Sequence, residues 1–73
     1  GMEFDFSKLL GRIIEKFGTR SAFATALEVA DSALSNRLNN KTYFDPDEIY
    51  RACDLLDLAP SDIPVYFFTV KVR

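Results

Sequence analysis

Residues 19–41, TRSAFATALEVADSALSNRLNNK, decide the fold of this 73-residue chain. Apolar side chains recur at helical spacing in each half of the stretch: Phe23, Ala24 and Leu27, then Ala33, Leu34 and Leu38. Only residues 28–30 remain to turn the chain between the two halves. The stretch therefore predicts two short helices that cross steeply and share a small core, an arrangement known as a helix-turn-helix.

The residues on either side of the turn predict clear helix ends. A helix over about 7–17 presents an apolar face and stops at Gly18, which favours the left-handed conformation that ends helices. Asn40 tolerates the same conformation better than other non-glycine residues, so it is expected to end the helix over about 31–39.

Residues 45–48, Asp-Pro-Asp-Glu, form the strongest local signal in the chain. The first aspartate is a helix cap, proline takes the first helical position, and the glutamate can reach back to the cap amide. This pattern predicts a helix that runs to about Leu58. Residues 60–62 then predict one more short helical turn, which Pro64 limits.

Both chain ends alternate apolar and polar residues, a pattern that predicts short strands over 2–6 and about 65–73. Antiparallel pairing of the two ends would bring opposite charges together at Glu3, Asp5, Lys71 and Arg73. Pairing within one chain and pairing between two copies satisfy the same residues. The ends therefore predict a terminal β element, which also serves as a dimerisation tail if a second copy provides the partner strand.

Length and composition limit the possible functions. The chain is expected to form one domain over 1–73, with 48% hydrophobic residues, no apolar run near the ~20 residues of a membrane span, and no secretion signal. Histidine is absent, which removes the usual general base and the commonest metal ligand. Cys53 lies on an apolar helix face and is interpreted as core filling. We expect a cytoplasmic protein that is not an enzyme and has no catalytic residue, metal, cofactor or small-molecule ligand.

Two stretches, residues 18–24 (GTRSAFA) and 34–41 (LSNRLNNK), together with the capped helix that ends Leu-Leu-Asp-Leu at 55–58, resemble the helix-turn-helix domain of phage Cro and repressor proteins, the XRE-like class. The full-length pattern is similar to small phage proteins described as putative Cro-type repressors. The resemblance implies a mainly α, lambda-repressor/Cro-like domain of five helices with a short terminal β element. Its helix-turn-helix would span about 19–41.

The resemblance also implies roles for individual residues. In this class the second of the two helices enters the major groove, so the residues expected to read bases are Asp31, Ser32, Ser35 and Asn36. The residues expected to contact DNA phosphates are Thr19, Arg20, Asn39, Lys41 and Thr42. Dimerisation is expected to use the apolar residues of the tail, Phe67, Phe68, Val70 and Val72.

Some residues depart from the pattern of the class. Glu28 holds the turn position that is usually glycine and must accept a positive φ or bend the turn differently. Ala30 replaces a serine or threonine cap, so Asp31 or Ser32 can be used for capping instead of base contact. Arg37 stands where an apolar residue is common. The chain is also acidic, with a net charge of −2 and a pI near 4.9, which weakens long-range attraction to DNA.

These features predict a sequence-specific transcriptional regulator of a phage or prophage, which binds a palindromic operator in double-stranded DNA as a homodimer. An alternative of a different class fits the same chain. A protein-interaction module could reuse the helix-turn-helix scaffold without DNA binding and contact its partner through the acidic fourth helix and the aromatic tail.

Overall fold

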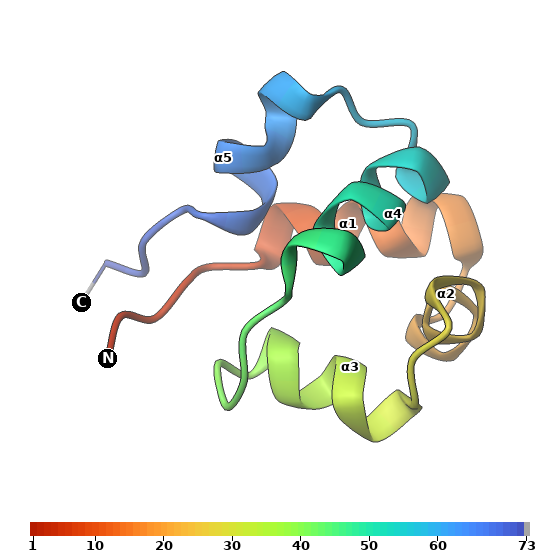
Figure 1. The fold of residues 1–73 in the computed structure, drawn as a ribbon, viewed down its shortest axis with the longest axis horizontal. Coiled ribbons are helices and arrows are strands. Elements are labelled where there is room, and N and C mark those ends of the chain that lie inside the picture. Colours follow the sequence, from red (N-terminus) through yellow and green to blue (C-terminus); the bar gives the residue numbers. More distant parts are fainter. Residues whose placement is uncertain (73) are drawn as a thin grey trace.

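Five α-helices and one 3-10 turn make up most of the structure, a computed structural model that describes residues 1–72. In chain order they are α1 (Ser7–Phe17), α2 (Arg20–Leu27), α3 (Asp31–Leu38), α4 (Pro46–Leu56), the 3-10 turn η1 (Pro60–Asp62) and α5 (Ile63–Phe67). Figure 1 shows α1 and α4 near the middle of the molecule, α3 and α5 toward opposite sides, and the two chain ends together at one edge. The prediction of a mainly helical domain with five helices is confirmed.

The α2–α3 segment has the two short helices and the three-residue connection that the sequence predicts. The Thr19 hydroxyl accepts a hydrogen bond from the Ala22 amide at 3.1 Å and so caps α2. Glu28 ends α2 with a φ of 65°, the left-handed conformation that its β-carbon disfavours. Ala30 stands at the start of α3 and supplies no side-chain cap. The turn therefore keeps its geometry without the residues that usually favour it.

Helix α4 begins as predicted but ends earlier. The Asp45 carboxylate accepts from the Glu48 amide at 2.8 Å, and the Glu48 carboxylate accepts from the Asp45 amide at 3.0 Å, which completes the capping box. The predicted end at Leu58 is wrong, because Asp57 adopts the left-handed conformation with a φ of 54°. The Leu58 amide then turns back to donate to the carbonyl of Cys53 at 2.9 Å.

One apolar core joins all five helices. Its buried members are Leu9, Ile13, Phe23, Ala24, Leu27, Leu34, Ile49, Ala52, Cys53, Leu56 and Phe67. The interpretation of Cys53 as core filling is confirmed, since the residue is 3% exposed. Burial raises the pKa of its thiol, with a further contribution from the charges of Asp54 and Asp62, so the group stays protonated near neutral pH.

The predicted strand over 65–73 is wrong for its first three residues. Val65, Tyr66 and Phe67 belong to α5, where Pro64 occupies a first-turn position that requires no amide donor. Proline here helps to start the helix rather than limit it. Alternation of aromatic and β-branched residues does not distinguish a short buried helix from a strand.

The chain ends pair within the chain, through one antiparallel bridge between Phe4 and Val70. The Asp5 amide donates to the Thr69 carbonyl at 2.7 Å, and the Lys71 amide donates to the Glu3 carbonyl at 2.9 Å. The predicted terminal β element is therefore reduced to a single bridge among the described residues. Arg73, the other basic residue of the predicted charge match, lies outside them.

None of the helices in residues 1–72 is long and apolar enough to cross a lipid bilayer.

Candidate functional site

The residues predicted to read bases lie along α3, but two of them already contact other side chains. The Asp31 carboxylate accepts from the Ser21 hydroxyl at 2.9 and 3.2 Å, which ties the start of α3 to α2. The Ser35 hydroxyl accepts from the side-chain amide of Asn39 at 3.2 Å. Ser32 is exposed and Asn36 is half-buried. The arrangement leaves this face of α3 polar, with an acidic group at its beginning.

Three of the residues predicted to contact phosphates line two depressions that meet at Asn40. Thr19 caps α2, and Arg20 is exposed beside it. At the other end of the segment, the amides of Lys41 and Thr42 donate to the Asn36 carbonyl at 2.8 and 3.3 Å. The structure brings Arg20 together with Asn39 at one groove, whereas Lys41 lines the other depression with the first residues of the chain.

Arg37 of α3, which stands where an apolar residue was expected, forms a buried ion pair with Glu48 of α4. Its guanidinium donates to both carboxylate oxygens at 2.8 and 2.9 Å, and it also donates to the Ala33 carbonyl at 3.0 Å. The Glu48 side chain is only 6% exposed and also accepts from the Asp45 amide in the capping box. A bidentate pair with this much burial fixes α3 against the start of α4.

Other basic residues are also held by acids or carbonyls. Arg12 of α1 donates to Glu15 at 2.7 Å and to the Leu56 carbonyl at the end of α4 at 2.8 Å. Lys16 donates to the Asp57 carboxylate at 2.8 Å. With Arg37–Glu48 and the 3.4 Å pair Arg51–Glu28, four of the eight basic residues within residues 1–72 form ion pairs there. These paired side chains stabilise the fold, so fewer basic side chains are available to bind a polyanion such as DNA.

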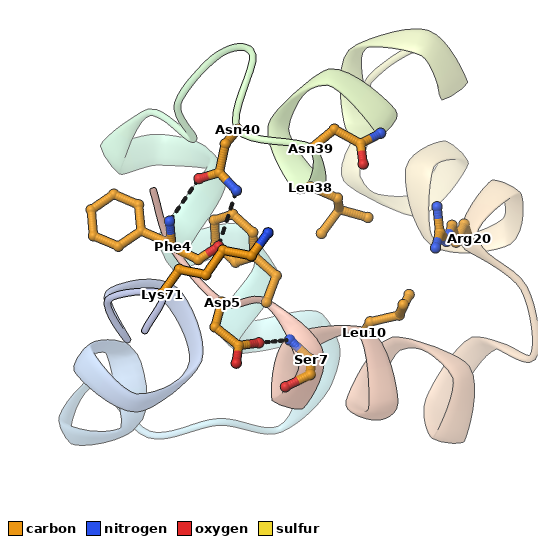
Figure 2. Close-up of a pocket in the computed structure, with 10 residues that line it drawn as sticks. Phe4, Asp5, Ser7, Leu10, Arg20, Leu38, Asn39, Asn40 and Lys71 are labelled. Carbon is orange, nitrogen blue, oxygen red and sulfur yellow. Dashed lines mark hydrogen bonds between the residues drawn. The ribbon is translucent and has the colours of Figure 1, made fainter. Parts of the chain in front are cut away.

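A groove of about 170 Å³ lies where the chain ends meet α1, α2 and the end of α3. We call it the chain-end groove. Its lining residues are Phe4, Asp5, Phe6, Ser7, Leu10, Arg20, Leu38, Asn39, Asn40 and Lys71. Figure 2 shows Leu10 and Leu38 directed toward one another from α1 and α3, with Arg20 on one side of them and Asp5 and Lys71 on the other. The groove thus combines an apolar floor with charged walls.

The two sides of the chain-end groove differ in net charge. The Asp5 carboxylate accepts from the Ser7 amide at 2.8 Å. Hydrogen bonds from the Ser7 side chain and amide lower the pKa of Asp5 below its ordinary value, and the nearby charge of Lys71 lowers it further. Asp5 and Lys71 therefore offset one another. The Arg20 side chain forms no ion pair or hydrogen bond with residues 1–72, and on its other side it lines a second depression with Asp31.

Asn40 closes one wall of the groove and was expected only to end a helix. It has the predicted positive φ, 63°. Its side chain also accepts from the Phe4 amide at 2.7 Å and donates to the Phe4 carbonyl at 3.0 Å, as a neighbouring strand would. Because Asn40 and Phe4 are 36 residues apart in the sequence, no local sequence pattern could predict this contact. Lys71 is also a groove residue, and the predicted pairing of the chain ends placed it near Asp5 but did not indicate a groove there.

The four residues predicted to form a dimer contact have different surroundings. Phe67 is 2% exposed and packs its ring against Phe44, with centroids 5.3 Å apart. Phe68, Val70 and Val72 are 49%, 50% and 93% exposed. The Phe68 ring contacts Phe4 edge-on. Only these last three residues present apolar surface to a partner, and their role in dimerisation stays a prediction.

Comparison with known proteins identifies relatives of a different kind from the Cro-type repressors. A family model described as "Protein of unknown function (DUF739)" matches residues 2–70. The chain is 46% identical to the modulator of repression (MOR) of the temperate bacteriophage TP901-1 from Lactococcus lactis. The solution structure of that protein matches with a TM-score of 0.82, over 99% of this chain and 97% of the other. A comparison with curated proteins finds no match.

The assignment to phage Cro and XRE-like repressors is therefore wrong. It rested on two short helices, a three-residue turn and a capped fourth helix, and small helical domains of different families share these features. The match over residues 2–70 takes in the whole arrangement, including the chain ends and α5. The chain belongs to the DUF739 family of proteins of unknown function.

Proposed function

We propose that the chain is a phage regulator that modulates repression by binding a repressor protein. In this proposal the α2–α3 segment is a helix-turn-helix scaffold that supports a protein contact and does not read DNA. The observation that carries the proposal is the 46% identity to a modulator of repression, which extends over nearly the full length of both chains. Relatives that share this much sequence over one whole domain commonly share the kind of partner they bind.

The distribution of charge supports a protein partner over DNA. Binding to duplex DNA depends on several unpaired basic residues that face the phosphates together. In the α2–α3 segment Arg37 is neutralised by Glu48, and Asp31 adds a negative charge to the face of α3. Arg20 and Lys41 remain, on adjoining depressions of the surface. Two exposed basic residues on an acidic protein provide little attraction to a DNA backbone.

The exposed face of α4 supports a partner that carries basic residues. Asp47, Tyr50 and Asp54 lie three and four residues apart, so they form one stripe on the helix, and all three are exposed. Tyr50 is 58% exposed, which is unusual for a large aromatic side chain in a domain with an ample core. Acidic groups around an exposed aromatic ring suit a contact with arginine or lysine.

Exposed apolar residues near the start of α4 support the same partner. Tyr43 and Phe68 are 64% and 49% exposed, and both rings contact Phe4 edge-on. Tyr43 precedes the cap of α4 by two residues, so this aromatic surface adjoins the acidic helix. An apolar centre beside charged groups is typical of protein interfaces.

A reporter gene tests the proposal. The reporter is placed behind an operator bound by the repressor of the same phage, and this chain is expressed beside that repressor. We expect a change in reporter expression that requires the repressor. The double variant Asp47→Lys/Asp54→Lys should abolish the change, whereas Glu15→Lys, an exposed charge reversal on α1, should keep it. An unchanged reporter, or the same change without the repressor, contradicts the proposal.

A further inference from the structure

We propose that the chain-end groove binds an acidic side chain that lies next to an aliphatic one on the protein partner. Arg20 holds the carboxylate, and the aliphatic group enters between Leu10 and Leu38. The inference rests on the proposed function and adds a second contact surface to it, made by α1, α2 and the end of α3.

The charge of Arg20 is the first argument. Its guanidinium is exposed and makes no ion pair or hydrogen bond with the described residues, while four other basic residues of the chain do so. Across the groove, Lys71 and Asp5 attract one another. A negatively charged group is therefore favoured on the Arg20 side. The planar guanidinium matches a carboxylate with two parallel hydrogen bonds.

The floor of the groove is the second argument. Leu10 and Leu38 are half-buried and face one another, and Phe6 adds aromatic surface beside them. Contact with an aliphatic side chain would remove this apolar surface from water. The volume of about 170 Å³ corresponds to five or six water molecules at roughly 30 Å³ each. It suits one or two side chains and is smaller than the roughly 300 Å³ at which small-molecule sites begin.

The apolar floor argues against a DNA phosphate in this groove. An arginine binds a phosphate as well as it binds a carboxylate, but a phosphate gains nothing from Leu10 and Leu38. Charge and apolar surface together therefore select a protein segment.

Titration of the ¹⁵N-labelled chain with short peptides tests the inference by nuclear magnetic resonance. The probes are the acidic peptide acetyl-Leu-Glu-Leu-Glu-amide, the basic peptide acetyl-Leu-Lys-Leu-Lys-amide, and a twelve-base-pair DNA duplex. We expect the acidic peptide to shift the amide signals of Arg20, Leu38 and Asn39. Equal shifts with the basic peptide, or shifts with the duplex and none with the acidic peptide, would overturn the inference.

Variants separate a specific contact from general attraction between charges. Arg20→Gln should lower the affinity for the acidic peptide by about fivefold, which corresponds to the loss of one exposed ion pair. Arg51→Gln removes an exposed arginine from α4, outside the groove, and should change the affinity by less than about twofold. Equal affinities for wild type and Arg20→Gln would contradict the assignment.

The phage's repressor distinguishes this inference from the proposed function. If the repressor binds wild type and Arg20→Gln equally well, the groove assignment fails and the proposed function stands. If the repressor does not bind wild type at all, the proposed function fails, and with it the partner assigned to the groove.

Discussion

The junction of α3 with α4 and the chain-end groove each contain one arginine of the α2–α3 segment, in opposite surroundings. Arg37 is 19% exposed and bound to both oxygens of a buried glutamate, whereas Arg20 is exposed and unpaired among the described residues. The same side chain is part of the fold in one place and available for binding in the other. Basic residues that are held in ion pairs within the domain stabilise the fold. Only the remaining, unpaired basic residues are informative about what the domain binds.

The largest expected effect comes from breaking the buried pair. Glu48→Ala leaves the Arg37 guanidinium without its partner and removes half of the capping box, so we expect a loss of about 3–5 kcal/mol in the free energy of unfolding. Urea denaturation followed by circular dichroism measures it. Arg20→Gln, the matched change in the groove, should stay within about 0.5 kcal/mol of wild type. Similar losses for both variants would remove the distinction between the two regions.

Asn40→Gly is expected to have the next largest effect, at the wall of the groove. Glycine keeps the positive φ of 63° but loses both hydrogen bonds to Phe4. We expect a loss of about 1–3 kcal/mol and faster hydrogen exchange at the Phe4 amide. Hydrogen exchange at the Ile13 amide in the core should become faster only to the extent that the free energy of global unfolding decreases. An unchanged Phe4 amide would mean that the side chain of Asn40 does not hold the chain end.

Glu28→Gly should stabilise the protein. Glycine adopts the φ of 65° without the steric penalty of a β-carbon, and the lost pair with Arg51 is long and exposed. The expected gain in unfolding free energy is about 0.5–1 kcal/mol, measured by urea denaturation. Glu28→Ala, which removes the same pair but keeps a β-carbon, should bring no gain. A loss with glycine would show that the pair matters more than the backbone.

The smallest expected effect concerns the exposed pair between Lys16 and Asp57. The hydrogen bond from Lys16, together with its charge, lowers the pKa of Asp57 below the ordinary 3.8. A lowered folded-state pKa stabilises the protein above about pH 4 and loses this effect as pH falls through the folded value. Lys16→Gln, which removes the partner and leaves the backbone at Asp57 unchanged, should therefore lower the Tm slightly at pH 7, and the difference from wild type should vanish near pH 2. A constant difference from pH 7 to pH 2 would rule out this linkage.

Much of the fold follows from local signals. Gly18, Asn40 and residues 45–48 each fix a helix end through their own backbone or cap chemistry, and all three predictions hold. The strand expected at Val65–Phe67 does not, because proline before an aromatic run suits a helix start as well as a strand.

The candidate site could not be predicted as a whole. The chain-end groove draws residues from both chain ends and three helices, and no short motif records that Lys71 lies opposite Arg20. The pair between Arg37 and Glu48 joins separate helices, so the sequence showed an unusual arginine but not its partner. The predicted DNA-contact residues were placed by a family resemblance that the match to DUF739 overturns.

Calorimetric titration of the purified chain tests the central claim most directly, with the repressor of the same phage in one experiment and a duplex carrying its operator in the other. At low salt, where DNA binding is strongest, we predict saturable binding to the repressor and none to the duplex at the same concentrations. Saturable binding to the duplex, with none to the repressor, would contradict the account.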